Sequence, residues 1–74
     1  MTRLATPVRN TLRLDEVSDT VMYIGEAAFG QNESNPVWRI KKVITVGTVL
    51  SVLWADGDDR FDNIWADRDS LTYI

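Results

Sequence analysis

The strongest constraint on the fold is a run of alternating apolar residues from Val37 to Trp54. A spacing of two places successive apolar side chains on one face of a pleated strand. The residues concerned are Trp38, Ile40, Ile44, Val46, Leu50, Val52 and Trp54. Gly47 interrupts the run where a strand would reverse, so the stretch predicts a β-hairpin. Lys42 breaks the alternation, which predicts either a β-bulge at Lys41-Lys42 or a short departure of the strand from the core.

Further strands are predicted on both sides of this hairpin. Thr20–Gly25 is rich in β-branched and aromatic residues and is apolar on both faces, which predicts a strand that is central or covered on two sides and ends at Gly25. Residues 26–36 are rich in turn-forming residues and predict a loop, with Ala27–Phe29 as a helical turn or a lid. Ser70–Ile74 is expected to be the last strand.

These patterns predict an all-β fold, a small antiparallel sheet or partly open β-barrel of four to five strands with an extended N-terminal arm. We expect two parts, an extended basic arm over residues 1–19 and a small β domain over residues 20–74. The arm shows no sustained periodicity, although Leu12 and Leu14 alternate with arginine and allow a short strand there. The plainer interpretation is a flexible chain end.

The length and composition of the chain indicate that it needs neighbours. A domain of 74 residues buries only roughly 60% of the surface that it exposes when unfolded. The chain has no cysteine and no histidine, so neither a disulfide nor one of the usual structural zinc sites can compensate for the thin core. We therefore expect a homo- or hetero-oligomer, in which the chain packs against copies of itself or a larger protein. The alternative is a monomer that folds alone, as many domains near this size do.

The candidate partner-binding residues lie in the arm and in the long loop. Arg3, Arg9 and Arg13 make the first fourteen residues basic, with no acidic residue among them. We expect these arginines to lie against the acidic surface of a neighbouring chain, and Phe29 to contribute a loop contact. The remainder of the chain is acidic, which disfavours a nucleic-acid partner. No apolar run approaches the roughly 20 residues of a membrane span, so no membrane partner is expected.

The residue types present argue against catalysis and against a cofactor. Without cysteine or histidine, the common nucleophile systems cannot be assembled. The clustered aspartates from Asp56 to Asp62 could suggest a calcium loop or a glycosidase pair, but Arg60 and Phe61 stand where a calcium loop needs a ligand and a glycine. A glycosidase cleft is too large for such a domain. We interpret this segment as a polar turn, with Asp56-Gly57 as a turn signal, and expect no metal site.

The aromatic residues have two interpretations. Three tryptophans and two tyrosines could form a stacking platform for sugars or bases, or they could fill the core. All except Trp65 fall at strand positions consistent with an inward face, which favours the core. Phe61, Ile64 and Trp65 are expected to form an aromatic plug on a short helical or 3₁₀ turn.

Several short motifs between Thr20 and Ile74 resemble a group of short, poorly characterised virion-associated proteins of tailed double-stranded DNA bacteriophages. The two tryptophan turns are the most specific part of the resemblance, and residues 1–19 lie outside it. The motifs are Tyr23-Ile24-Gly25-Glu26-Ala27, Trp38-Arg39-Ile40, Trp54-Ala55-Asp56-Gly57, Phe61-Asp62-Asn63-Ile64-Trp65, and Arg68 with Ser70-Leu71-Thr72-Tyr73.

The resemblance implies a non-enzymatic structural or accessory protein of the virion, made in the host cytoplasm. Its expected places are head decoration, the neck, or a tail or fibre connector, in contact with larger virion proteins. It supplies no catalytic residues. The alternative from the residues is a small carbohydrate- or ligand-binding β-module that recognises the host surface.

Overall fold

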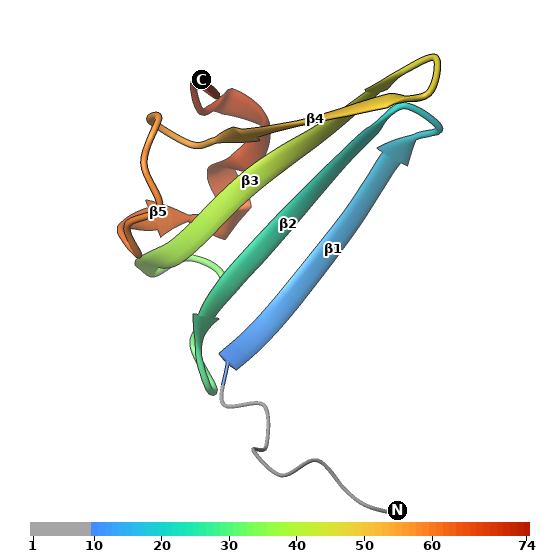
Figure 1. Ribbon diagram of the computed structural model, residues 1–74. Helices are drawn as coiled ribbons and strands as arrows, with labels where there is room; N and C mark the ends of the chain where they lie inside the picture. The colour runs from blue at the N-terminus through green and yellow to red at the C-terminus, as the bar shows by residue number, and fades with distance from the viewer. Residues whose placement is uncertain (1–9) are drawn as a thin grey trace, which may run out of the picture.

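The alternating stretch forms the expected hairpin in the computed structural model, which describes residues 10–74 (Figure 1). Strand β3 spans Pro36–Val46 and strand β4 spans Val49–Trp54. Val46 pairs with Val49 at the tip of the hairpin. Gly47 there has a φ of 61°, in the left-handed region that glycine adopts most easily. The alternation and the turn signal therefore predicted the hairpin but not its faces. Because Val46 pairs with Val49, the apolar residues of β4 (Leu50, Val52 and Trp54) lie on the face opposite to those of β3 (Trp38, Ile40, Ile44 and Val46).

The hairpin belongs to a small open antiparallel sheet, which confirms the predicted all-β fold class. Strands β1 (Asn10–Ser18) and β2 (Val21–Ala28) precede it, and the order across the sheet is β1-β2-β3-β4. Strand β5 (Asn63–Ile64) pairs with the beginning of β3, beyond the residues that pair with β4. Strand β2 is central, as its apolar faces predict.

Half of the predicted N-terminal arm is part of this sheet. Residues 10–18 form β1, whose partner is β2 of the same chain. The expected boundary between residues 19 and 20 therefore falls in the tight turn between these two strands. Residues 1–9 lie outside the described part of the chain. The alternation of Leu12 and Leu14 was the signal for this strand, and the ladder with β2 extends it to nine residues.

Two local predictions are contradicted, the end of β2 at Gly25 and the β-bulge, one of the two alternatives for Lys41-Lys42, because pairing with the neighbouring strands continues through both positions. Strand β2 does not end at Gly25 but continues to Ala28, so residues 27 and 28 are extended and form no helical turn. The register of β3 is regular on both sides at Lys41 and Lys42, so no bulge is present there. The Lys42 ammonium lies 5.7 Å from the ring centroids of both Tyr23 and Tyr73, which gives this charge a favourable place among aromatic rings.

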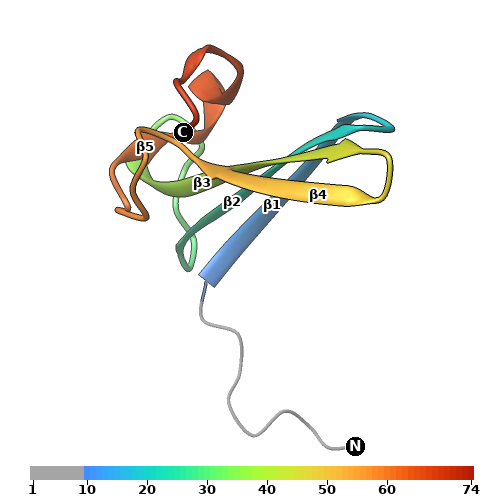
Figure 2. The same cartoon turned by 45° about the horizontal axis from the view of Figure 1, so that its top comes forward.

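The carboxyl-terminal segment covers one face of the sheet (Figure 2). Its 3₁₀-helix η1 (Trp65–Ser70) begins with Trp65, which is buried against Trp38 with ring centroids 5.9 Å apart. Gly25 provides the space for this packing, because a Cβ there would overlap the ring of Trp65 and lie 3.3 Å from that of Trp38. The buried cluster is Tyr23, Ala27, Trp38, Ile40, Ala55 and Trp65.

Polar contacts also tie this segment to the sheet. Arg68 Nε lies 2.9 Å from a carboxylate oxygen of Asp15 on β1, and the Tyr73 hydroxyl donates to the Arg68 carbonyl at 2.7 Å. Burial raises the pKa of Tyr73 above its ordinary value. The expected strand at Ser70–Ile74 is reduced to a single bridge between Ala55 and Tyr73, because η1 extends to Ser70. Within residues 10–74, no helix has the length and apolar character needed to cross a membrane.

We expect Gly25→Ala to lower the free energy of unfolding by about 2 kcal/mol or more, because forcing atoms into a packed core costs roughly 1–3 kcal/mol. Denaturant unfolding followed by tryptophan fluorescence measures this. Gly30→Asn is the control, because Gly30 has a φ of 82°, which asparagine tolerates, and a Cβ added there would have no neighbouring atom within 4 Å. Equal losses in the two variants would contradict the proposed role of the Trp65 contact.

We expect stability to fall at alkaline pH partly through Tyr73. Because its pKa is raised in the folded state, its contribution is complete below the ordinary tyrosine pKa of about 10 and is lost as the pH rises above it. Tyr73→Phe should lose about 1 kcal/mol at neutral pH, through the missing hydrogen bond, and should show a shallower decline between about pH 9 and 12. Unfolding curves at several pH values test this, and parallel pH profiles would contradict it.

Candidate interaction face

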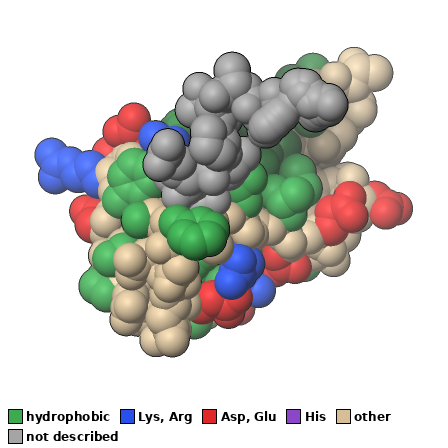
Figure 3. Space-filling view, turned by 90° about the horizontal axis from the view of Figure 1, so that it is seen from below, with side chains coloured by type: hydrophobic (Ala, Val, Ile, Leu, Met, Phe, Trp, Pro, Cys, Tyr) green, Lys and Arg blue, Asp and Glu red, His purple; other side chains and the backbone are tan. Residues whose placement is uncertain are grey.

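The face of the sheet that points away from η1 is the main surface left without a neighbour in this fold, and we call it the open face. Within residues 10–74, no helix or strand packs on it (Figure 2), although the loop after β4 brings Phe61 against Arg39 at its margin. The registers place the same set of alternating side chains from β1 to β4 on this face. Its apolar members are Leu12, Leu14, Met22, Ile24, Val43, Leu50, Val52 and Trp54. Figure 3 shows apolar side chains at the surface between charged ones on one side of the molecule.

The apolar side chains at the two edges of the open face are well exposed. Leu12 and Leu14 on β1 are 50% and 68% exposed, and Leu50 and Val52 on β4 are 64% and 51% exposed. Single exposed apolar residues are ordinary, but an apolar group that extends over neighbouring strands is typical of an interaction surface. The open face therefore has the character of a docking surface.

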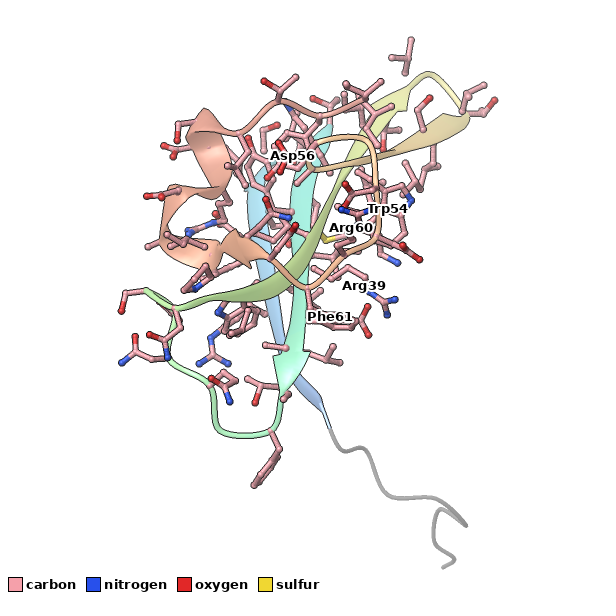
Figure 4. The ribbon with its side chains drawn as sticks, turned by 90° about the vertical axis from the view of Figure 1, so that its left-hand side faces the viewer. Arg39, Trp54, Asp56, Arg60 and Phe61 are labelled. Carbon is pink, nitrogen blue, oxygen red and sulfur yellow. The ribbon has the colours of Figure 1, made fainter. Side chains whose placement is uncertain are left out.

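A cation–aromatic cluster lies on the same face near β5 (Figure 4). The guanidinium of Arg39 lies 4.6 Å from the ring centroid of Phe61 and 5.7 Å from that of Trp54. Its Nη2 is 2.8 Å from a carboxylate oxygen of Glu26, and the Lys41 ammonium lies 5.1 Å from the Trp54 ring. Two cations of β3 thus lie near the ring of the half-buried Trp54, which leaves less of the ring available for stacking on a ligand.

A small hollow adjoins this cluster. It has a volume of about 340 Å³ and is lined by Ala28, Gln31, Val37 and Phe61. The lining contains no acid, no base and no nucleophile. The hollow can therefore accept an apolar group but has no side chain that could catalyse a reaction.

Two of the four predicted partner-binding residues, Arg13 and Phe29, lie within the described part of the chain. Arg13 lies on the covered side of β1, where its Nε is 2.7 Å from a Glu33 carboxylate oxygen and its guanidinium is 5.6 Å from the Trp38 ring centroid. Both contacts of Arg13 are therefore with residues of its own chain. Phe29 lies in the turn after β2 and is 79% exposed. Arg3 and Arg9 lie outside the described residues.

The tryptophans and aspartates fall largely as the plainer interpretations predict. Trp38 and Trp65 are buried in the core, and Trp54 is half-buried, so the three rings form no common platform. Two aromatic residues differ from the prediction. Trp54 was expected to face inward, but its pairing with Lys41 places it on the open face. Phe61 was expected in an inner aromatic plug but is 46% exposed beside Arg39 on the open face. Asp56 and Gly57 both have positive φ and form the expected turn. Among residues 10–74, no three acidic side chains are grouped closely enough to hold a metal ion.

Comparison with known proteins adds no further assignment. No protein-family model, curated protein or solved structure matches this chain. The resemblance to phage virion proteins therefore stays a prediction.

We expect Phe61→Ala to lower stability by about 1 kcal/mol, because it removes the ring that lies over the Arg39 guanidinium. Phe29→Ala is the matched control, since that ring is 79% exposed and its loss should change stability by less than about 0.5 kcal/mol. Thermal and urea unfolding of the two variants measure the difference. Equal effects would show that the cluster does not contribute to folding.

Proposed function

We propose that this protein is a non-enzymatic structural component that docks on a larger protein through the open face of its sheet. The observation that carries the proposal is the exposure of Leu12 and Leu14 on β1, next to Ile24 of β2, on a face without a cover among the described elements. Burying apolar area of this kind contributes roughly 25 cal/mol per Å², which provides the driving force for docking.

The one-sided core supports the same function. The buried cluster lies entirely between the sheet and the carboxyl-terminal segment, and of the described apolar residues on the open face only Val43 is buried. Antiparallel sheets can tolerate one solvated face, but such a face is usually polar. The open face is apolar at both edges, so contact with another protein surface is more favourable for it than contact with water.

We propose a tailed phage particle as the setting, in head decoration, the neck, or a tail or fibre connector. This part rests on the motifs that resemble short virion-associated proteins. A virion supplies many copies of large proteins on which a small sheet can dock. The open face carries Arg39 and Lys41 together with Glu16 and Glu26, and Arg39 is paired with Glu26, so we expect a partner surface that is mainly apolar and has no strong charge of one sign.

The alternative function, a carbohydrate- or ligand-binding module, stays a prediction. Its best supporting feature is the apolar hollow beside Phe61. Titration with glycans, followed by tryptophan fluorescence, tests it directly through Trp54, which lies in the same cluster.

The docking proposal is tested in particles produced from the genome that encodes this chain. We expect the protein to co-sediment with gradient-purified particles in many copies, and Leu14→Lys to reduce its amount there at least about tenfold, because a buried lysine opposes docking. Quantitative mass spectrometry of the particles measures both.

Val46→Lys is the matched control. Val46 is 72% exposed, similar to Leu14, but it lies on the opposite face at the hairpin tip. Both variants should keep the circular dichroism spectrum of the parent. Absence of the protein from purified particles would overturn the virion setting, and equal incorporation of the two variants would overturn docking through the open face.

A further inference from the structure

Strand β4 is an exposed sheet edge without the usual protection against pairing. Its residues, Val49–Trp54, include no charged side chain and no proline. Natural edge strands are commonly blunted by lysine, proline, a bulge or a covering segment. The other edge of the sheet, β1, carries Arg13, Asp15 and Glu16. The two edges therefore differ in chemistry, and β4 is the one suited to pairing.

Hydrogen bonds at one end of β4 show which backbone groups face outward. The Trp54 N–H donates to the Ile74 carbonyl at 3.2 Å, and the Ile74 N–H donates to the Trp54 carbonyl at 3.0 Å. The backbone groups of Trp54 therefore point away from β3. Because this direction alternates along a strand, those of Val52 and Leu50 point the same way. Among residues 10–74, no backbone bond from outside the hairpin reaches these two residues.

We propose that β4 pairs antiparallel with β4 of a second copy of this chain. With the two-fold axis at Ser51, Leu50 of one chain pairs reciprocally with Val52 of the other through their outward N–H and carbonyl groups. Such an interface is isologous and closed, so it yields a dimer rather than a filament. This inference goes beyond the proposed function, since it concerns a different edge of the molecule and does not require a virion.

The side chains favour a second copy over an unrelated strand. Since β4 carries no charge, antiparallel self-pairing places no like charges opposite each other. On the open face, Met22, Val43 and Val52 lie side by side across three strands. Pairing about Ser51 would place Leu50 of the second chain next to Val52 and continue this apolar row into the next sheet. The exposed apolar side chains of the edge would thereby cover each other.

The expected dimer is weak. Pairing of about five residues per chain buries far less than the roughly 1,200–2,000 Å² of a stable interface. The test is therefore sedimentation velocity over a range of concentrations, with the carboxyl terminus free of any tag. We expect a concentration-dependent dimer, and an at least tenfold higher dissociation constant for Val52→Lys. Leu14→Lys, a leucine-to-lysine change on the same face at the opposite edge, should dimerise like the parent.

Amide hydrogen exchange by NMR provides the second measurement. The N–H groups of Leu50 and Val52 should gain protection as the concentration rises, whereas residues of β1 should not. Val52→Pro removes one outward donor without removing a bond to β3, so it should fold and stay monomeric. A monomer at all concentrations, a dimer that survives Val52→Lys, or protection that arises only when another protein is added would each overturn the proposal.

Discussion

The packing of Trp65 over Gly25 is the contact on which the rest of this structure depends. The chain has no cysteine and therefore no disulfide to hold the sheet, and the interior is supplied by the segment that follows β4. That segment can lie flat on the sheet only because β2 has no side chain at Gly25. Trp38 then lies beside Trp65, and its Nε1 donates to the Asn32 carbonyl at 3.0 Å, which also fixes the loop before β3. The absence of a Cβ at Gly25 thus allows η1, the loop before β3 and the buried cluster to pack together.

This arrangement makes the two faces of the sheet unequal. The carboxyl-terminal segment lies on one face, and all but one of the described buried apolar residues lie there. On the other face, β1 and β4 carry exposed leucines and valines, with the Arg39 cluster between them. The open face and the β4 edge are therefore direct results of how a chain of this length distributes its apolar residues. The docking and the self-pairing that we propose would use different parts of this surface.

Local sequence pattern predicted the main strands, but it did not predict all of their ends or which side chains form the open face. The alternation around Gly47 identified the β3–β4 hairpin, and the two apolar faces of β2 identified its central place. Gly25 was interpreted as a strand end because the ring that requires it comes from the far end of the sequence. Arg13 was predicted to contact a partner, and nothing in the sequence indicated its contacts with Glu33 and Trp38 of the same chain. The open face could be recognised only once the registers showed which side chains of four strands share a side.

The two hydrogen bonds between Trp54 and Ile74 have a practical consequence. The neighbouring bridge of Ala55 to Tyr73 is antiparallel, so any residue following Ile74 would run alongside Leu53 and then Val52. A purification tag or fusion at this end would be delivered onto the edge of β4 as an additional strand. It would form hydrogen bonds with the outward N–H and carbonyl groups of β4, to which a neighbouring strand could otherwise bind. A fusion at the carboxyl terminus would therefore cover the β4 edge, whereas a fusion elsewhere would leave this edge free.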